Sequence, residues 1–526
     1  MSRHHQKSNA PQAVKKRGVM ANTFTVASWT MFSRLLGFVR DILLARVLGA
    51  GALADAFFVA LKLPNFFRRM LAEGTLTVAL IPVLAAERQR GEEAAHAYLN
   101  ALATLLLILL LLLAVIGVVA MPWLLLLFAP GFHHQPDRWQ QALLLARWMF
   151  PYLALITLSA MGWAVLNAHR RFAVAAASPA LLNLAIIFAA IILAPSMANP
   201  GLALAFGVLA GGVLQLAIQI PALKRIGWRP RLSLDWQQPA IKRTLKLFFP
   251  ALMGVAAVQI NILIGTILAT LLATGAVSYL YYADRIVQLP LALFGIAMGS
   301  ALMPTLSSLL AEQRNHEARL QLQQGIGWLT WITLPATIGI LILAEPIIIT
   351  LFANGKFGYH DAIATAHTLQ AYAIGLIPFC WAKILSAACF ANQDSKAPMR
   401  YAFISVAINI VLAIILMQFW QWVGLALATS LAAIVNVLLL LRRTGRHYGS
   451  LMVASVWARI AKAASACLPM AALLLALPQL WPFPTHHKLA QCGWLALAVS
   501  GGLIIFLACA WLFGERTLIN QLRRRS

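Results

Sequence analysis

The sequence predicts an all-α integral membrane protein with about fourteen transmembrane helices: two six-helix lobes related by an internal parallel repeat, plus two C-terminal helices. Three observations predict this class. Hydrophobic residues make up 61% of the 526-residue chain and charged residues only 11%, whereas a soluble domain is about half apolar and a quarter charged. The apolar residues form runs long enough to cross about 30 Å of hydrocarbon. Several sequence landmarks also occur twice. These features exclude a soluble globular protein.

The predicted spans follow one another with short connections. We place them at residues 22–48, 52–86, 97–128, 142–167, 173–195, 201–223, 245–272, 276–311, 325–352, 363–392, 400–420, 424–441, 457–478 and 490–513. The residues before Val19 are basic, but the span that follows carries charges and does not end in a small-residue cleavage site. We therefore expect no cleaved signal peptide.

The basic residues predict the orientation of the spans. An even number of spans places both termini on one side, and most of the 41 Lys and Arg residues fall in connections on that side. The opposite connections hold Arg138, Arg147, Lys356 and Lys488. By the positive-inside rule both termini are cytoplasmic. The net charge of +26 then reflects topology and contact with anionic lipid, and we expect no nucleic-acid partner.

Landmarks of the first half recur in the second half about 225 residues later. The run Leu127–Phe132 matches Leu351–Phe357, Gly201–Ala205 matches Gly424–Ala428, and Pro64, Pro82 and Asn183 match Pro290, Pro304 and Asn409. Because each half holds an even number of spans, the halves are expected to share one orientation, with a cleft between them at mid-depth.

The repeat also sets the expected domain boundaries. A basic cytoplasmic extension (1–21) precedes the N-lobe (22–224), and a basic cytoplasmic linker (225–244) precedes the C-lobe (245–446). Spans thirteen and fourteen (447–514) lie outside the repeat, which predicts a separate role for them, and a basic tail (515–526) follows.

Charged residues inside the predicted spans are the main functional signal. The bases are Arg34, Arg40, Arg46, Lys62, Arg68, Arg69, Arg285 and Lys383, and the acids are Asp41, Asp55, Glu73 and Asp284. Each charge at mid-membrane costs about 2.5 to 3.5 kcal/mol on insertion scales, so the first span cannot face lipid all round. The excess of bases favours an external polyanion such as a diphosphate, because guanidinium groups bind phosphate oxygens bidentately. An internal lattice of salt bridges is the alternative.

Spacing separates these charges into different expected roles. Asp55, Lys62, Arg69 and Glu73 form one stripe of alternating sign on the second span, which could neutralise itself. Arg68 lies off that stripe and is a better candidate for an external anion. Adjacent residues do not face each other on a helix, so we expect the partner of Arg285 to be a residue other than the neighbouring Asp284.

The sequence contains no motif for catalysis. We find no P-loop, no zinc-protease motif, no paired-Asp motif for metal-dependent phosphate chemistry and no convincing Ser/His/Asp set. The five cysteines have no metal-ligand spacing. We therefore expect no catalytic residues, no metal site, no cofactor and no enzymatic activity. The source of energy, a membrane potential or an ion gradient, is left open.

Several runs of residues resemble a known family. They are Thr30–Asp41, Gly49–Ala60, Lys62–Asn65, Arg68–Arg69, Glu73–Gly74, Tyr281–Arg285, Met303–Ser307 and Asn392–Pro398. Together they resemble the MurJ (MviN) family of bacterial lipid II flippases, in the multidrug/oligosaccharidyl-lipid/polysaccharide exporter superfamily. The resemblance implies two six-helix lobes around a central cavity, with the last two helices forming a groove for the lipid tail.

The resemblance also implies a substrate and a site. The substrate is lipid II, the undecaprenyl-diphosphate-linked disaccharide-pentapeptide of peptidoglycan synthesis, moved from the cytoplasmic to the periplasmic leaflet by alternating access. By motif match the substrate-binding residues fall on Arg34, Arg40, Arg68, Arg285, Asp41 and Asp55, with Ser278 at a further cavity-side position. Lys62, within a matching run, completes the candidate set. Gln288 stands where some members carry an acid, which puts a charge relay there in doubt, and a sodium site is not assumed.

The resemblance places the chain in the bacterial inner membrane, with lipid II and membrane lipids as partners. Cell-wall synthesis proteins are candidate protein partners, and the oligomeric state is left open. An exporter of other lipid-linked oligosaccharides, of O-antigen or capsule type, or of drugs is the alternative function. A membrane enzyme acting on polyprenyl phosphate lacks its motifs, and a structural scaffold would leave the intramembrane arginines unexplained.

Overall fold

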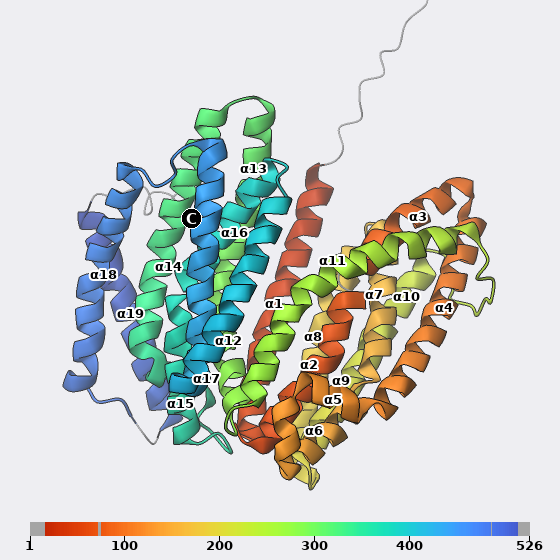
Figure 1. Cartoon of the computed structure of the whole chain (residues 1–526), viewed down its shortest axis with the longest axis horizontal. Helices are drawn as coiled ribbons and strands as arrows, with labels where there is room; N and C mark the ends of the chain where they lie inside the picture. Colours follow the sequence, from red (N-terminus) through yellow and green to blue (C-terminus); the bar gives the residue numbers. More distant parts are fainter. Residues whose placement is uncertain (1–15, 72–74, 485–486, 514–526) are drawn as a thin grey trace, which may run out of the picture. The chain divides into compact units, whose positions relative to one another are not determined.

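The computed structural model describes residues 16–71, 75–484 and 487–513, nearly all of them α-helical (Figure 1). No β-strand occurs within those ranges, which confirms the all-α prediction. Glu73, the predicted basic tail and most of the predicted N-terminal extension lie outside the described residues.

The helices follow one another along the chain. In order they are α1 (Lys16–Leu48), α2 (Ala52–Leu71), α3 (Thr77–Arg90), α4 (Glu92–Val119), α5 (Met121–Phe128), the 3-10 helix η2 (Pro130–His134), α6 (Pro136–Met149), α7 (Tyr152–Ala168), α8 (Phe172–Phe188), the π-helix η3 (Ala189–Leu193), the 3-10 helix η4 (Ala194–Ser196), α9 (Pro200–Ala217), α10 (Gln219–Arg225), α11 (Pro239–Thr270), α12 (Ala276–Pro290), the π-helix η5 (Leu291–Ile296), α13 (Ala297–Ala311), α14 (Asn315–Phe352), α15 (Tyr359–Ile374), α16 (Leu376–Ala391), α17 (Lys396–Tyr448), α18 (Ala454–Leu480) and α19 (Lys488–Leu512).

Ten helical stretches of the described chain are long and apolar enough to cross a membrane. They account for the predicted spans except those at 22–48, 52–86 and 245–272, which the structure forms as α1, as α2 with α3, and as α11. The predicted spans at 400–420 and 424–441 lie in α17, where Trp420 and Gln421 have non-helical backbone angles. The membrane class is confirmed, while the count of fourteen stays a prediction.

Proline explains the local form of the predicted span at 276–311. Pro290 ends α12 and is followed directly by the π-helical segment η5. Proline has no backbone N–H and its ring clashes with the preceding turn, and a π-turn is one of the defects that accommodate such a break.

The chain forms two compact units. The first unit comprises the described residues up to Asp41, together with 63–119 and 147–259. Its main core joins α3, α4 and α7 to the start of α11, and includes the buried side chains of Tyr98 and Trp228. Within this unit a methyl group added at Gly211 would lie 2.7 Å from the side chain of Leu182 on α8, so this small residue permits close packing of α9 against α8.

The second unit comprises residues 42–62, 120–146 and the described residues from 260 onward. In it α18 and α19 lie beside each other and beside α14 (Figure 1). Their shared core contains Trp331 from α14, Met470 from α18 and Trp494 from α19. The two last helices are therefore packed onto one helix of the unit. The predicted boundaries of the N-lobe and the C-lobe stay a prediction.

The repeated loop motif makes equivalent contacts in its two copies, both within the second unit. In the first copy, a Cβ added at Gly131 would clash with the carbonyl oxygen of Thr270, at the end of α11. In the second copy, a Cβ added at Gly355 would clash with the carbonyl oxygen of Arg46, near the end of α1. The helices α1 and α11 hold the first predicted span of each half. Each loop therefore packs against the first helix of the other half, as a repeated architecture requires.

We expect Gly355→Ala to destabilise the protein. Gly355 has φ +63°, the neighbouring Lys356 N–H donates to the Arg46 carbonyl oxygen at 3.0 Å, and an alanine would add both backbone strain and a clash. The left-handed conformation alone costs about 1 to 2 kcal/mol for a residue with a Cβ. The thermal unfolding midpoint of the purified protein should fall. Gly339→Ala on α14, where nothing lies within 4 Å of the added Cβ, is the matched control, and equal midpoints for the two variants would contradict this account.

Candidate functional site

The first unit holds four of the predicted site residues, Arg34, Arg40, Asp41 and Arg68. Arg40 and Asp41 are directly bonded: Arg40 Nε and Nη2 donate to Asp41 Oδ1 at 3.0 and 2.7 Å. The Asp41 side chain is 3% exposed and that of Arg40 is 14% exposed. The pair is therefore largely shielded from solvent, where an ion pair is stronger than at a surface.

Asn183 on α8 holds this pair in place. Arg40 Nη1 donates to Asn183 Oδ1 at 2.9 Å, and Asn183 Nδ2 donates to the Ser33 carbonyl oxygen on α1 at 2.9 Å. The amide thus fixes both the guanidinium and the helix that carries it. The sequence analysis used Asn183 only as a repeat landmark. Asn183 could have been noticed in the sequence, because a polar side chain within an apolar span is unfavourable unless it has a hydrogen-bonding partner.

Arg34 and Arg68 lie elsewhere on the same unit. Arg34 is exposed on α1, and Arg68 is half-buried in the last turn of α2. Three predicted anion-binding arginines, Arg34, Arg40 and Arg68, therefore lie in the first unit.

Arg285 is the predicted arginine of the second unit, and the expectation about its partner was wrong. Arg285 Nη2 lies 3.4 Å from Asp284 Oδ2, the carboxylate of the adjacent residue. A long, flexible arginine side chain can reach around the helix, so the rule for facing positions does not limit it. The guanidinium also lies over the ring of Tyr281, 4.8 Å from its centroid, and Asp284 accepts a hydrogen bond from Gln288 at 3.3 Å. With its side chain 38% exposed, the Arg285 pair is weak.

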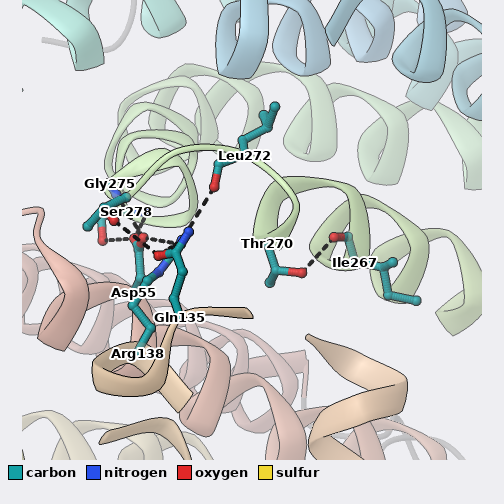
Figure 2. A network of polar contacts seen from close by, with 9 residues as sticks. Asp55, Gln135, Arg138, Ile267, Thr270, Leu272, Gly275 and Ser278 are labelled. Carbon is teal, nitrogen blue, oxygen red and sulfur yellow. Dashed lines mark hydrogen bonds and ion pairs between the residues drawn. The ribbon is translucent and has the colours of Figure 1, made fainter. Parts of the chain in front are cut away.

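Asp55 lies at the centre of a buried network in the second unit (Figure 2). Its side chain is fully buried. Oδ1 accepts hydrogen bonds from the backbone N–H and the hydroxyl of Ser278 at 2.9 and 2.7 Å, and Oδ2 accepts from the Gly275 N–H at 2.8 Å. The carboxylate thus caps the first turn of α12, where a negative charge is favourable.

Arg138 completes the network and was missed by the sequence analysis, which placed it in an outer connection. It lies on α6 with 1% of its side chain exposed, and its Nη2 is 2.8 Å from Asp55 Oδ2. Nη1 donates to Gln135 Oε1 at 2.9 Å and to the Leu272 carbonyl oxygen at 3.3 Å (Figure 2). No local pattern signals this partner, because it lies 83 residues away in the chain.

Within the stripe on the second span, Asp55 has Arg138 as its charge partner; self-neutralisation of Lys62, Arg69 and Glu73 stays a prediction. Lys62 donates to Thr266 Oγ1 on α11 at 3.2 Å. In the described conformation Asp55 bonds Arg138 and Ser278 and so holds α2, α6 and α12 together. No cluster of His, Cys, Asp and Glu that could hold a metal ion occurs in the described ranges.

The run Asn392–Pro398, one of the family-like signatures, has a structural explanation. Arg443 Nε and Nη2 lie 2.8 and 2.7 Å from Asp394 Oδ2, and Asp394 Oδ1 accepts from the Ala397 N–H at 3.1 Å. Desolvation alone would raise the pKa of Asp394, but these hydrogen bonds and the positive charge of Arg443 hold the pKa below its ordinary value. This loop therefore fixes the start of α17 against its end.

We expect Asp55 and Arg138 to be energetically coupled. Removing one member of a buried ion pair leaves the other charge uncompensated, which costs about 3 to 5 kcal/mol. Asp55→Asn and Arg138→Gln should each lower the thermal unfolding midpoint, and the double variant should be less destabilised than the sum of the two. Arg314→Gln, which breaks an exposed pair with Glu317, should change stability by less than about 0.5 kcal/mol. Strictly additive losses for Asp55 and Arg138 would contradict the coupling.

Comparisons with known proteins place this arrangement in a family. The family model described as "Lipid II flippase MurJ" matches residues 44–490. A probable lipid II flippase MurJ of Haemophilus influenzae is 35% identical over 93% of this chain and 98% of its own length. The protein of the same description from Vibrio cholerae is 35% identical over 96% of this chain and 97% of its own length.

Solved structures agree with this assignment. A structure described as lipid II flippase MurJ in an inward closed conformation matches with a TM-score of 0.78 and 26% identity, covering 94% of this chain and 99% of that chain. An inward-facing multidrug resistance transporter of the MATE family matches with a TM-score of 0.63 at 17% identity, covering 80% of this chain and 98% of that chain; this likeness concerns the fold alone. The extent of the family match, from α1 to α19, shows that the chain belongs to the lipid II flippase MurJ family.

Proposed function

We propose that this protein translocates lipid II from the cytoplasmic to the periplasmic leaflet by alternating access. The observation that carries the proposal is the 35% identity to a probable lipid II flippase over 98% of that protein's length. The arginine-rich candidate set supports a diphosphate-bearing substrate. The family assignment also favours lipid II over the alternative substrates, namely other lipid-linked oligosaccharides and drugs.

The chain is a multi-pass protein of the inner membrane, and we propose that both its termini face the cytoplasm. The distribution of Lys and Arg between the connections supports this orientation. We further propose that the protein acts without a catalytic residue, metal or cofactor, and that cell-wall synthesis proteins are its candidate protein partners.

We propose that the diphosphate binds Arg34, Arg40, Arg68 and Arg285. Guanidinium groups stay charged at any depth and present parallel N–H donors to phosphate oxygens. The side chain of Arg34 is exposed and that of Arg285 is 38% exposed, so an anion can reach both guanidinium groups. These features support a site that gains its strongest interactions when the anion arrives.

Asp41 has a different proposed role in the same site. Its carboxylate accepts hydrogen bonds from Nε and Nη2 of Arg40, and Asn183 Oδ1 accepts one from Nη1. The carboxylate therefore neutralises and orients Arg40 in the described conformation. A phosphate that binds Arg40 has to compete with Asp41, which makes this contact reversible and suits a carrier that must release its substrate.

Asp55, Ser278 and Lys62 stay proposed substrate-binding residues for another stage of the cycle. In the described conformation the Asp55 carboxylate accepts hydrogen bonds from Arg138, Gly275 and Ser278. We propose that the network opens when α2 and α12 move apart during alternating access. The buried pair would then provide a stable closed state, and its opening would expose both charges to the substrate path.

The lipid tail and the driving force complete the proposal. α18 and α19 leave Leu468, Leu475, Leu503 and Ile504 exposed, and an apolar surface of this kind supports a path for the polyprenyl chain. The membrane potential, at about 2.3 kcal/mol per charge per 100 mV, would favour return of the empty, cationic site toward the cytoplasm.

Replacing Arg68 or Arg285 by Lys tests the proposed diphosphate site. Lysine keeps the charge but loses the bidentate fork, so lipid II binding should weaken about tenfold or more, because a hydrogen bond to a charged group contributes about 1.5 to 3 kcal/mol. Binding of lipid II to the purified variants and growth of cells depleted of their own flippase are the two measurements. Arg88→Lys, at an exposed residue paired with Glu92, should bind and support growth normally. Full binding by both Arg68→Lys and Arg285→Lys would contradict the proposed contacts.

A further inference from the structure

The segment between α10 and α11 is held against α4 by hydrogen bonds, all within the first unit. Trp228 Nε1 and the Arg231 N–H both donate to Asn100 Oδ1, at 2.9 and 3.1 Å. The Ser233 N–H donates to Thr104 Oγ1 at 2.9 Å. Figure 1 shows this connection as a ribbon without helices that follows α4. Two polar side chains of α4 thus accept hydrogen bonds from the indole of Trp228 and from two backbone N–H groups of the connecting segment.

The position of Thr104 on α4 sets the depth of this segment. Thr104 is twelve residues beyond Glu92, or about 18 Å along the helix axis at 1.5 Å per residue. The residues that follow it, 105–119, include no charged or hydrogen-bonding side chain. About 20 residues of helix are needed to cross the hydrocarbon, and counting back from Val119 reaches Asn100. A crossing that ends at Val119, the last residue of α4, thus places the contacts with Asn100 and Thr104 at the edge of the hydrocarbon layer.

The side chains of the segment suit that depth. Leu232, Leu234 and Trp236 alternate along the chain and are 80%, 71% and 42% exposed. Leucine and tryptophan side chains of this kind are costly in water but stable at a membrane interface. The backbone N–H groups of Arg231 and Ser233 already have partners on α4, which meets the requirement that backbone groups near hydrocarbon be satisfied.

The charges around the segment are predominantly positive. The bases from Lys224 to Lys246 are Lys224, Arg225, Arg229, Arg231, Lys242, Arg243 and Lys246, and the single acid is Asp235. The Asp235 carboxylate accepts a hydrogen bond from Gln238 at 2.9 Å. Exposed Arg229 and Arg231 flank the apolar side chains directly. Basic residues beside inserted apolar ones are the pattern that binds anionic lipid surfaces.

We propose that residues 228–236 form a non-spanning membrane-interface segment that inserts Leu232, Leu234 and Trp236 into one leaflet and binds anionic phospholipid headgroups through Arg229 and Arg231. The segment is bonded to α4 near one end, and α11 begins three residues after Trp236. The inserted segment therefore holds the first residues of α11 at a fixed depth in the membrane. The proposed cytoplasmic orientation of the termini places this segment in the cytoplasmic leaflet. The insertion of its side chains does not depend on that orientation.

Insertion can be measured with a fluorescent label on the full-length protein. Leu234→Cys carries an environment-sensitive dye, in a background where the accessible Cys492 and Cys509 are replaced by Ser, and the protein is placed in nanodiscs containing phosphatidylglycerol. Lipids with a nitroxide near the headgroup should quench this dye several-fold more than a dye at Glu93→Cys. Glu93 lies on α4 about 16 Å along the helix from Thr104, which bonds the segment, and so serves as the control position outside the membrane. Equal quenching at the two positions would overturn the insertion and favour a protein partner on this surface.

Recognition of the headgroup is tested separately. Short-chain phosphatidylglycerol is titrated into the labelled protein in detergent, with phosphatidylcholine as the uncharged comparison. Arg229→Gln with Arg231→Gln should weaken phosphatidylglycerol binding about tenfold or more, because each base near an anionic lipid contributes roughly fivefold. Arg88→Gln with Arg90→Gln, which removes two arginines that already have acidic partners, should leave binding unchanged. Unchanged binding in the first variant, or equal binding of both lipids, would overturn the headgroup contact. Neither measurement depends on lipid II transport.

Discussion

The cost of placing charge in the hydrocarbon layer governs this structure. An unpaired charge there is so unfavourable that each intramembrane arginine needs an acid, an aromatic face or an aqueous path. Asp55 and Arg138 meet this requirement within the second unit, with the carboxylate also capping α12. Arg40 meets it in the first unit through Asp41 and Asn183. The predicted bases outnumber the predicted acids in the sequence, which is why we propose an external anion, and the family of the chain favours a lipid-linked diphosphate.

The sequence was sufficient for the features that depend on composition and periodicity. It predicted the all-helical membrane class, the positions of most spans and a repeat whose loop glycines, Gly131 and Gly355, make matching contacts. These features are readable because apolar length and backbone geometry are local properties. The predicted break between the spans at 400–420 and 424–441 coincides with the non-helical backbone at Trp420 and Gln421 within α17, where Gly424 lies against the backbone of Leu416.

The partners of the charged side chains were less predictable, because pairing in a folded chain is a long-range property. Arg138 looked like one more base of an outer connection, yet it is buried against Asp55. Arg285 was expected to avoid its neighbour Asp284, but a long side chain does not obey the facing rule for short ones. Asn183 could have been noticed from its cost in an apolar span. The motif matches propose a set of site residues, and the structure shows that some of them, such as Arg40 and Asp41, bond each other.

The central claim is that this protein moves a lipid-linked diphosphate across the membrane, and the most direct measurement is made in living cells. The protein is depleted in cells that have no second flippase, and lipid II accessible at the outer face is labelled and compared with the total pool. The account predicts that the outer-face pool falls while lipid II accumulates inside. An outer-face pool that stays constant as the protein disappears would contradict it.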